Sequence, residues 1–218
     1  MKKLPEIPGK NQLPVDIKGL FTEFYETNRW GSLESASGPG SELVQTKEVR
    51  AALPMLFRRF DVRTMLDAPC GDFNWMRHVD LSRLETYVGV DIVRPLIRHN
   101  QDNYSSRKIS FLEKDLTKDL LPAADLVFCR DCLVHLSNSE AQKVLENFLL
   151  SKSRYLLTTN YVGEVANRDT SMGRWRPLNL SLPPFSLPEP ILTIDTDFTA
   201  EGRQHPGNGM SLWALPWK

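Results

Sequence analysis

Short apolar runs alternate with amphipathic segments through the middle of the chain. We predict strands at the apolar and β-branched runs, which occupy 64–67, 86–92, 109–113, 125–129 and 154–160. Helices are predicted between them, a short one at 72–78 and longer ones at 93–104 and 138–151. Short buried strands separated by helices are typical of an α/β protein whose parallel sheet is covered on both faces.

The two ends of the chain have different patterns. Residues 1–20 contain prolines at 5, 8 and 14, which favours an extended arm. Apolar residues near helical spacing predict a helix that begins at Ser41, its N-cap, and is kinked or divided at Pro54. Near the C-terminus, 191–198 and 210–217 are predicted to pair as an antiparallel hairpin.

Length and composition indicate a single domain. The chain has 218 residues, of which 41% are hydrophobic, and this is enough for one substantial core. We expect residues 1–40 to form an N-terminal arm and cap, and residues 41–218 to form one domain. Within that domain, the proline-rich segment 161–190 is long for a connection and is predicted to be a substrate loop or lid.

Charge and cysteine content narrow the classes of partner. The 27 basic residues balance 27 acidic residues, which disfavours nucleic acid as a partner. No apolar stretch reaches the ~18 residues of a membrane span, so we expect a cytoplasmic protein without a membrane partner. Cys129 and Cys132 have CxxC-like spacing but no second ligand pair, so no metal site is predicted. The oligomeric state is left open.

The first predicted strand leads into a loop with two acids and a single glycine. The sequence "LDAPCGDF" places Asp67 and Asp72 on either side of Gly71, at the edge where an open parallel sheet binds its ligand. Gly71 lets the backbone approach a ligand closely. A dinucleotide pyrophosphate requires several glycines and no crowd of acids. The loop therefore favours a cationic ligand over a phosphate.

Two further acids follow the next two predicted strands. Asp91 ends the second strand, where a carboxylate can accept hydrogen bonds from both hydroxyls of a ribose. Asp115 follows the third strand and can accept from an exocyclic amine such as that of adenine. Acids for an amino group, a ribose and an adenine together indicate S-adenosylmethionine as the cofactor.

From residue 64 to about 160, these motifs resemble those of the class I S-adenosylmethionine-dependent methyltransferases. "LDAPCGDF" is similar to the glycine-rich first motif of that family, "VGVDI" to its second-motif acid, "EKDL" to its adenine acid, and "DLVFCRDCLVHL" to its fourth strand and following loop. Pro69 and Phe73 stand in place of two of the family's glycines. The resemblance implies a Rossmann-like doubly wound seven-stranded sheet, mostly parallel, with a C-terminal antiparallel hairpin.

The resemblance also implies which residues hold the cofactor. They are expected to be Asp67, Ala68, Cys70, Gly71, Asp72, Asp91, Ile92, Asp115, Leu116 and Arg130. For Arg130, an ion pair with a surface acid is an equally open alternative. "PCGDFNWM", together with the upstream "WGSLESASGPGSELVQT", is similar to a small bacterial group linked with the tailoring of surface polysaccharides or other small molecules.

Two titratable residues after the fourth strand are candidates for removing a proton from the methyl acceptor. Asp131 and His135 are four residues apart, so one helical turn would place them on one side. An imidazole with the ordinary pKa near ~6.5 suits a general base. The alternative is that His135 packs beside Leu133 and Leu136 and bonds a carbonyl.

Polar and aromatic residues outside the motifs are candidates for binding the acceptor. They are Trp30, Ser41, Gln45, Asn160, Tyr161, Arg174 and Trp175. Arginine suits a carboxylate or phosphate, and tryptophan suits a sugar face or a cation. The structural alternatives are a helix cap for Ser41, a buried anchor for Trp30, and surface arginines on a meandering loop.

The predicted function is methyl transfer from S-adenosylmethionine to a polar small molecule. O-methylation is favoured over N-methylation, and the acceptor could be a sugar or carry a phosphate. Three alternatives stay open: a catalytically degenerate protein of the same fold that binds cofactor or a partner, a nicotinamide-dependent oxidoreductase, and a nucleic-acid methyltransferase. The acids of the first loop argue against the oxidoreductase, and the balanced charge argues against nucleic acid.

Overall fold

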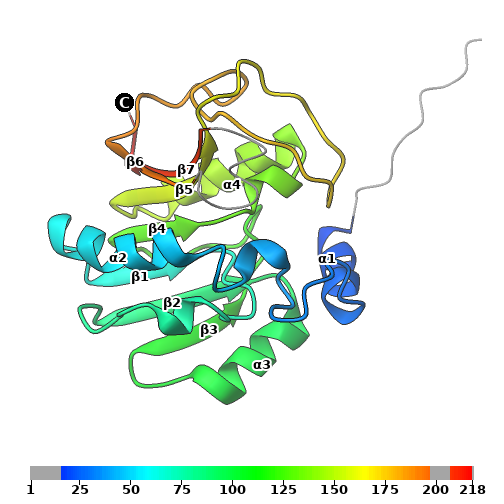
Figure 1. The fold of residues 1–218 in the computed structure, drawn as a ribbon, viewed down its shortest axis with the longest axis vertical. Coiled ribbons are helices and arrows are strands. Elements are labelled where there is room, and N and C mark those ends of the chain that lie inside the picture. The colour runs from blue at the N-terminus through cyan, green and yellow to red at the C-terminus, as the bar shows by residue number, and fades with distance from the viewer. Residues whose placement is uncertain (1–15, 197–206, 218) are drawn as a thin grey trace, which may run out of the picture.

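The computed structural model describes residues 16–196 and 207–217, which form one seven-stranded sheet flanked by helices (Figure 1). The strands are β1 (Thr64–Asp67), β2 (Thr86–Asp91), β3 (Ile109–Glu113), β4 (Leu126–Cys129), β5 (Tyr155–Tyr161), β6 (Leu192–Asp195) and β7 (Asn208–Ala214). Their order across the sheet is β3-β2-β1-β4-β5-β7-β6. Strands β1 to β5 pair in parallel, whereas β7 runs antiparallel to both β5 and β6. The predicted fold class is confirmed.

Four α-helices flank the sheet in the described part of the chain. They are α1 (Ile17–Glu26), α2 (Lys47–Arg59), α3 (Arg94–Tyr104) and α4 (Asn138–Leu150), with short 3₁₀ turns η1 (Pro39–Ser41), η2 (Met76–His78) and η3 (Leu133–His135). Two of them, α3 and α4, lie at nearly the predicted positions. The short helix predicted at 72–78 is reduced to η2. Over the described ranges, no helix has the length and apolar character that crossing a membrane requires.

Alternate residues of each central strand face two separate cores. On β1, Met65 packs into the core that contains α2 and α3, and Leu66 packs into the core that contains α4. On β4, Leu126 and Val127 divide in the same way. Burial on both faces explains why these strands are continuous apolar runs. It leaves the strand ends as the place where polar side chains can meet a ligand.

The N-terminal arm predicted for residues 1–20 is partly wrong, because a helix begins within it. The N-cap of α1, Asp16, accepts a hydrogen bond from Gly19 N at 2.9 Å. Lys18 on α1 pairs with Glu113 at the end of β3, and Glu113 also pairs with Arg94 at 2.7 Å. These ion pairs tie α1 to the carboxyl edge of the sheet. Residues 1–15 of the predicted arm lie outside the described residues.

The helix predicted from Ser41 begins later and is not divided. Ser41 ends the turn η1, so its prediction as the N-cap is wrong, and α2 begins only after Thr46. The helix continues through Pro54, although proline removes one backbone hydrogen bond. Leu53 and Phe57 on either side are fully buried, and their packing offsets that loss.

The last third of the chain follows the predicted order. The segment between β5 and β6 contains no helix or strand, in agreement with the predicted loop at 161–190. The two predicted C-terminal strands pair antiparallel as β6 and β7, and most of the turn between them lies outside the described residues. The division into an arm and cap at 1–40 and one domain at 41–218 stays a prediction.

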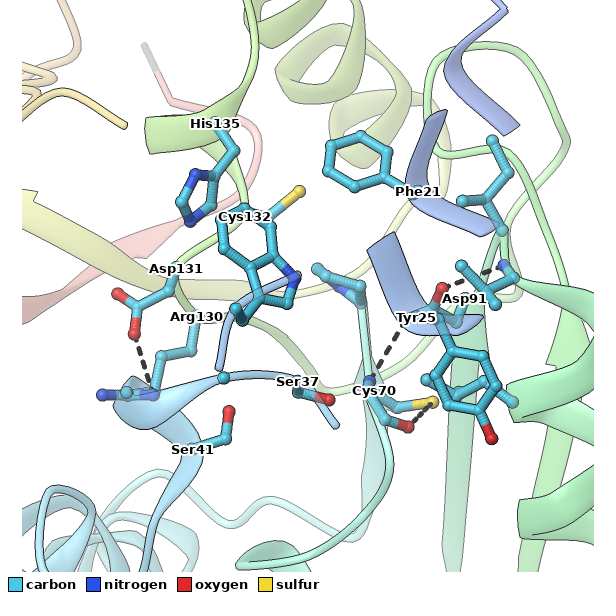
Figure 2. Close-up of a pocket in the computed structure, with 18 of the residues that line it drawn as sticks. Phe21, Tyr25, Ser37, Ser41, Cys70, Asp91, Arg130, Asp131, Cys132 and His135 are labelled. Atoms are coloured by element: carbon cyan, nitrogen blue, oxygen red, sulfur yellow. Dashed lines mark hydrogen bonds and ion pairs between the residues drawn. The ribbon is translucent and has the colours of Figure 1, made fainter. Parts of the chain in front are cut away.

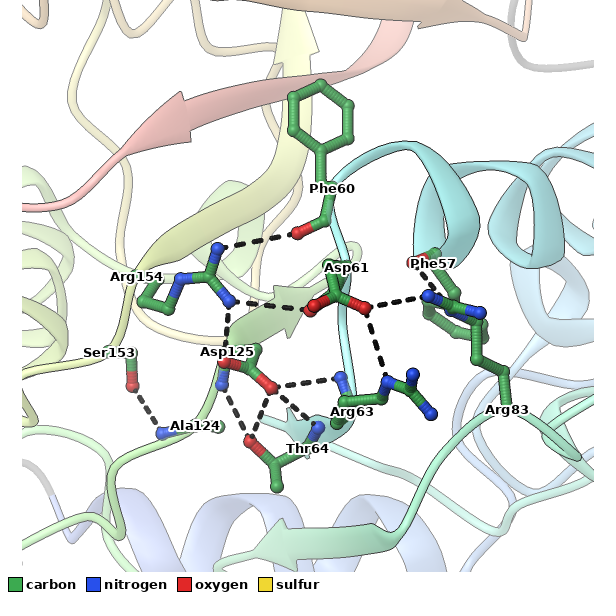
Figure 3. Close-up of polar contacts among 10 residues, drawn as sticks. All are labelled: Phe57, Phe60, Asp61, Arg63, Thr64, Arg83, Ala124, Asp125, Ser153 and Arg154. Carbon is green, nitrogen blue, oxygen red and sulfur yellow. Dashed lines mark hydrogen bonds and ion pairs between the residues drawn. The ribbon is translucent and has the colours of Figure 1, made fainter.

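The amino ends of the central strands are joined by one carboxylate. Asp125 accepts hydrogen bonds from Arg63 N and Thr64 N, both at 2.9 Å, and from Thr64 Oγ1 at 3.1 Å (Figure 3). Arg154, at the start of β5, donates to the same carboxylate at 2.8 Å. These bonds hold the pKa of Asp125 below its usual range against the opposing effect of burial. Asp125 therefore fixes the starts of β1, β4 and β5 relative to one another.

Substituting Asp125→Ala should lower the free energy of unfolding by about 2 kcal/mol, because it leaves several donors without an acceptor. Urea denaturation followed by circular dichroism measures this change. Asp61→Ala is the matched control, since Asp61 pairs with Arg63 and Arg83 in the same network but is exposed, so little change is expected. Equal losses in the two variants would contradict the assigned role of Asp125.

Candidate functional site

A cavity of about 560 Å³ opens at the carboxyl ends of β1, β2 and β4. This is within the range of about 300–1,000 Å³ found for small-molecule sites. Its wall is built by the strand ends, α1, the segment around η1, η3 and one residue of the long loop after β5. In Figure 2, His135, Asp131, Arg130 and Ser41 lie on one side of the cavity, and Asp91 and Tyr25 lie on the other.

Two buried carboxyls lie at the ends of neighbouring strands. Asp67 accepts a short hydrogen bond from the Tyr87 hydroxyl. Asp91 accepts from Val93 N at 3.0 Å and from Gly71 N at 3.2 Å. Burial raises the pKa of Asp67 to about 8, with a further contribution from the charge of Asp91, and burial raises the pKa of Asp91 to about 6. The pair therefore favours a positively charged ligand.

A third carboxyl, Asp115, lies at the rim of the cavity after β3. It accepts from Thr117 N at 2.9 Å and from Thr117 Oγ1 at 2.6 Å, and it pairs with Lys118 at 3.0 Å. Burial alone would raise the pKa of Asp115, but these partners hold it below the usual range. Asp115 is thus ionised and fixed in orientation, and Leu116 lines the cavity beside it.

The loop after β1 is held against the segment that precedes η1. Asp72 accepts from Ser35 Oγ at 2.9 Å and from Ala36 N at 2.7 Å, and Ser37 Oγ accepts from Asp72 N at 2.9 Å. Gly71 has a φ of 55°, and a Cβ there would lie 2.3 Å from Ser37 Oγ. The turn therefore requires glycine at position 71. Asp72 positions this wall and is not among the residues that line the cavity, and the cofactor-binding role expected for it stays a prediction.

On the other side of the cavity, a guanidinium group and a carboxylate form an ion pair and compensate each other's charge. Arg130 Nη1 lies 2.8 Å from Asp131 Oδ2. Asp131 N donates to Thr159 Oγ1 at 2.8 Å, and Thr159 Oγ1 donates to Asp131 Oδ1 at 3.1 Å. Asp131 has a φ of 51°, a conformation that non-glycine residues rarely adopt. Such strain is common at functional sites, where the surrounding contacts maintain it.

His135 lies on the same side and is uncharged at neutral pH. Its ring packs against Trp30 with a centroid distance of 4.7 Å, and its Nδ1 is buried without a hydrogen-bond partner among the described residues. Burial lowers the pKa of His135 to about 4, more than the nearby charge of Asp131 raises it. The ordinary imidazole pKa expected from the sequence is therefore wrong. The 3₁₀ turn η3 holds His135, where a helical turn was expected.

Most of the residues predicted from the sequence line this one cavity. They are Trp30, Ser41, Gln45, Asp67, Cys70, Gly71, Asp91, Ile92, Asp115, Leu116, Arg130, Asp131, His135 and Trp175. The residues predicted but found elsewhere are Ala68, Asp72, Asn160, Tyr161 and Arg174. The cofactor-binding, catalytic and substrate-binding roles given to all of them stay predictions.

The residues outside the cavity have structural reasons for their positions. Ala68 is fully buried in the core, and Tyr161 is fully buried with its ring edge-on to Trp175 at 5.7 Å. Asn160 donates to Ser211 Oγ at 3.1 Å and accepts from Leu180 N at 2.8 Å, so it fastens the long loop to the sheet. Arg174 is exposed to solvent.

Several lining residues were missed by sequence reasoning. They are chiefly the α1 residues Ile17, Phe21 and Tyr25, together with Ser37, Trp75, Thr117 and Cys132. The recurrence of apolar residues every four positions from Ile17, after Asp16 as N-cap, is a helix signal that could have identified α1. Within the described part of the chain, no group of His, Cys, Asp and Glu side chains is arranged to hold a metal ion.

The fold is similar to those of solved methyltransferases, although no protein-family model and no curated protein matches the sequence. One similar structure is the 1,6-didemethyltoxoflavin-N1-methyltransferase of Burkholderia thailandensis, with a TM-score of 0.62 and 12% identity over 91% of this chain and 86% of that chain. The magnesium protoporphyrin IX methyltransferase of Synechocystis PCC 6803 has a TM-score of 0.59 and 14% identity over 93% and 99%. Human N-acetylserotonin methyltransferase has a TM-score of 0.54 and 14% identity over 90% and 66%. At these identities the similarity establishes the fold alone.

The raised pKa values of Asp67 and Asp91 predict an unusual pH dependence of stability for the ligand-free protein. Between the unfolded value near ~4 and the folded values of about 6 and 8, the native state binds more protons than the unfolded state, so stability falls as pH rises. Between pH 5 and pH 8.5, wild type should lose roughly 2–4 kcal/mol more of its free energy of unfolding than Asp67→Asn, because residue 67 of the variant cannot ionise. Urea denaturation at both pH values measures this difference. Asp102→Asn, on the exposed side of α3, should match wild type. Parallel profiles for wild type and Asp67→Asn would contradict the burial of a protonated Asp67.

Proposed function

We propose that this protein is an S-adenosylmethionine-dependent methyltransferase that methylates a small molecule, on oxygen in preference to nitrogen. One observation carries the proposal: Asp67, Asp91 and Asp115, which follow three successive strands, line a single cavity. Carboxyls at these strand ends suit a ligand with a positive charge, a ribose and an exocyclic amine.

The residues present fit such a cofactor. The carboxyls of Asp67 and Asp91 are buried without a cationic partner among the described ion pairs, so a sulfonium and an ammonium group would compensate them. Gly71 leaves no room for a Cβ, which keeps the backbone of this loop close to the cavity. A nicotinamide dinucleotide, whose pyrophosphate is anionic, would meet these carboxyls without compensation.

Each acid has a distinct part in holding the cofactor under this proposal. Asp91, oriented by two backbone N–H groups, would accept from the ribose hydroxyls. Asp115 and the adjacent Leu116 would hold the adenine edge. Because Asp72 is engaged by the segment before η1, the amino group is assigned to Asp67 alone.

The solved structures of similar fold support the same class of ligand. The enzyme of Synechocystis PCC 6803 and the human enzyme were crystallised with S-adenosylmethionine, and the Burkholderia thailandensis enzyme with S-adenosylhomocysteine and 1,6-didemethyltoxoflavin. Those three enzymes methylate different acceptors, so they support the reaction class here without specifying an acceptor.

The preference for oxygen rests on His135. When bound, S-adenosylmethionine supplies an electrophilic methyl group. A hydroxyl acceptor must lose its proton as it attacks. The neutral His135 lines the cavity, and its Nδ1, which has no hydrogen-bond partner among the described residues, can take this proton. Asp131 is the second candidate, but its carboxylate is already engaged by Arg130 and Thr159. We therefore assign the general base to His135.

The arginines that suggested an anionic or phosphate-bearing acceptor do not support one. Arg174 is exposed and does not line the cavity. Arg176 donates to Leu133 O at 3.0 Å and to Asn138 Oδ1 at 2.8 Å, which ties the long loop to η3. Among the described residues, Arg130 is the one arginine in the wall, and Asp131 compensates it.

The alternative of a degenerate, non-catalytic protein loses its main support. It depended on Phe73, which stands where related motifs have a glycine. Phe73 is buried in the core, with ring centroids of Tyr87, Tyr104 and Phe111 at 5.2–5.4 Å, and it does not line the cavity. Its φ of 58° gives the backbone the left-handed conformation that glycine would adopt. Phe73 therefore leaves the space of the cavity unchanged.

Cofactor binding is tested directly by stability. S-adenosylmethionine at ~100 times its dissociation constant should add about 2.7 kcal/mol of stability in a thermal-shift experiment. Asp91→Asn should weaken binding by about 1.5–3 kcal/mol in calorimetry, because the ribose loses a charged acceptor. Asp102→Asn is the control and should bind as wild type. A shift with a nicotinamide dinucleotide, or none with S-adenosylmethionine, would refute the proposed function.

Binding should also release protons at neutral pH. A cationic ligand lowers the pKa of Asp67 and Asp91 from their free values of about 8 and 6, so affinity should rise about tenfold between pH 6 and 8 and level off above. Calorimetry at pH 7 in two buffers of different ionisation enthalpy measures the released protons. Asp67→Asn should reduce both effects. Proton uptake on binding would show that these carboxyls do not face the positive charge.

A further inference from the structure

Tryptophan side chains form part of the cavity wall, and on the side away from the acids Trp30 packs against His135 and Trp75 lies beside Arg130. Of the five tryptophans in the chain, Trp30, Trp75 and Trp175 line the cavity. Tryptophan is usually found in the core, so this proportion is high. The indole rings give the cavity flat apolar walls with little conformational freedom.

The indole rings of Trp30 and Trp175 are each held in place by an aromatic neighbour. Phe24 packs edge-on to Trp30 at 5.0 Å, and the backbone of Gly38 lies so close to Trp30 that a Cβ there would be 2.8 Å from its Cβ. Tyr161 packs edge-on to Trp175 at 5.7 Å. The indoles are therefore rigid before any ligand enters, which reduces the entropic cost of binding a flat molecule.

The charges on this side of the cavity sum to zero. Arg130 and Asp131 neutralise each other at 2.8 Å, and Arg130 also lies over the Trp75 ring, 5.9 Å from its centroid. His135 is neutral. An ammonium group would find no uncompensated carboxylate among the described residues of this side, and a phosphate would find no uncompensated cation. A neutral acceptor fits best.

A buried ring nitrogen of His135 has no hydrogen-bond partner among the described residues. His135 Nδ1 is buried, and the Trp30 ring covers the imidazole at 4.7 Å (Figure 2 shows His135 on the side of the Arg130–Asp131 pair). A buried nitrogen without a partner is costly, and a hydroxyl on the ligand would satisfy it.

We infer that the methyl acceptor is a neutral, planar aromatic molecule with a phenolic hydroxyl, bound against the indoles of Trp30 and Trp175 with its hydroxyl directed to His135 Nδ1. The inference rests on the proposed function and specifies its substrate class. It replaces the sugar or phosphate-bearing acceptor expected from the sequence.

The weak basicity of His135 agrees with this class. Burial lowers its pKa to about 4. Such a base is poorly matched to an aliphatic or sugar hydroxyl, whose pKa is close to the ~16 of water. A phenol, with a pKa near ~10 as in tyrosine, gives up its proton far more readily.

The test compares three probes on protein saturated with S-adenosylhomocysteine. Calorimetry measures the dissociation constants of 2-naphthol, its saturated counterpart 2-decalol, and glucose 6-phosphate. We expect 2-naphthol to bind at least about tenfold more tightly than either of the others, because only it can stack on the indoles and present a phenolic hydroxyl. Mass spectrometry with S-adenosylmethionine should detect the methyl ether of 2-naphthol.

Substitutions test whether 2-naphthol binds against the indole of Trp30. Trp30→Leu should weaken 2-naphthol about tenfold and change the affinity for S-adenosylhomocysteine less than twofold. Trp217→Leu is the matched control, because Trp217 packs against the α4 core and does not line the cavity. It should leave both affinities unchanged. Trp30→Phe retains an aromatic face and should restore most of the affinity lost in Trp30→Leu.

The outcomes separate the two proposals. If S-adenosylhomocysteine does not bind, the proposed function fails. If it binds but 2-decalol or glucose 6-phosphate equals or exceeds 2-naphthol, the function stands and the aromatic acceptor is refuted. If Trp30→Leu weakens S-adenosylhomocysteine as much as 2-naphthol, the placement of the acceptor against Trp30 is refuted. The probe comparison on wild type decides the substrate class even if a variant does not fold.

Discussion

Two buried carboxyls at adjacent strand ends set the chemistry of the whole cavity. Asp67 is held by the Tyr87 hydroxyl, and Asp91 is held by the N–H groups of Gly71 and Val93. The parallel register places β1 and β2 side by side, so neither acid can move away from the other without breaking the sheet. Burial disfavours the charged form of each carboxyl, and this is the main reason why the pKa values of both are raised. A cationic ligand would offset that penalty. The positions of the two acids at the edge of the sheet therefore favour a positively charged ligand.

The loop after β1 links this acidic side to the opposite side. Asp72 fixes the segment before η1 through Ser35 and Ala36, and that segment leads directly into the turn around Gly40. A Cβ on Gly40 would lie 3.2 Å from Asp131 Oδ2, so the turn packs closely against the Arg130–Asp131 pair. Asp72, which the sequence predicts as a ligand for the cofactor, therefore also holds the loop after β1 against the segment before η1. Through these contacts, the Asp72 carboxylate fixes the position of the cavity wall between the acidic side and the side of the Arg130–Asp131 pair.

Periodicity identified the sheet because burial on both faces leaves a strong mark on the sequence. All four residues of β4 are apolar, β1 and β2 have apolar residues at their centres, and acids appear where β1 and β2 end, at Asp67 and Asp91. The less successful predictions concern residues whose environment is set by distant contacts. Asn160 and Tyr161 also lie at the end of a parallel strand, β5. They pack against the long loop and β7, which are far from them in sequence. The basicity of His135 likewise depends on its burial under Trp30, which no local pattern reveals.

The two sides of the cavity differ in how their charges are balanced. On the acidic side, Asp67 and Asp91 have hydrogen-bond donors but no cationic partner among the described ion pairs, so a positive ligand would compensate them. On the other side, Arg130 compensates Asp131, and the strained backbone of Asp131 is maintained by Thr159. Two cationic ligands would leave a net positive charge on the side where Arg130 and Asp131 already compensate each other. Two anionic ligands would leave the charges of both sides without compensation. The asymmetry agrees with the proposal of one charged and one neutral ligand in a single cavity, since a group transfer needs its two reactants held close together.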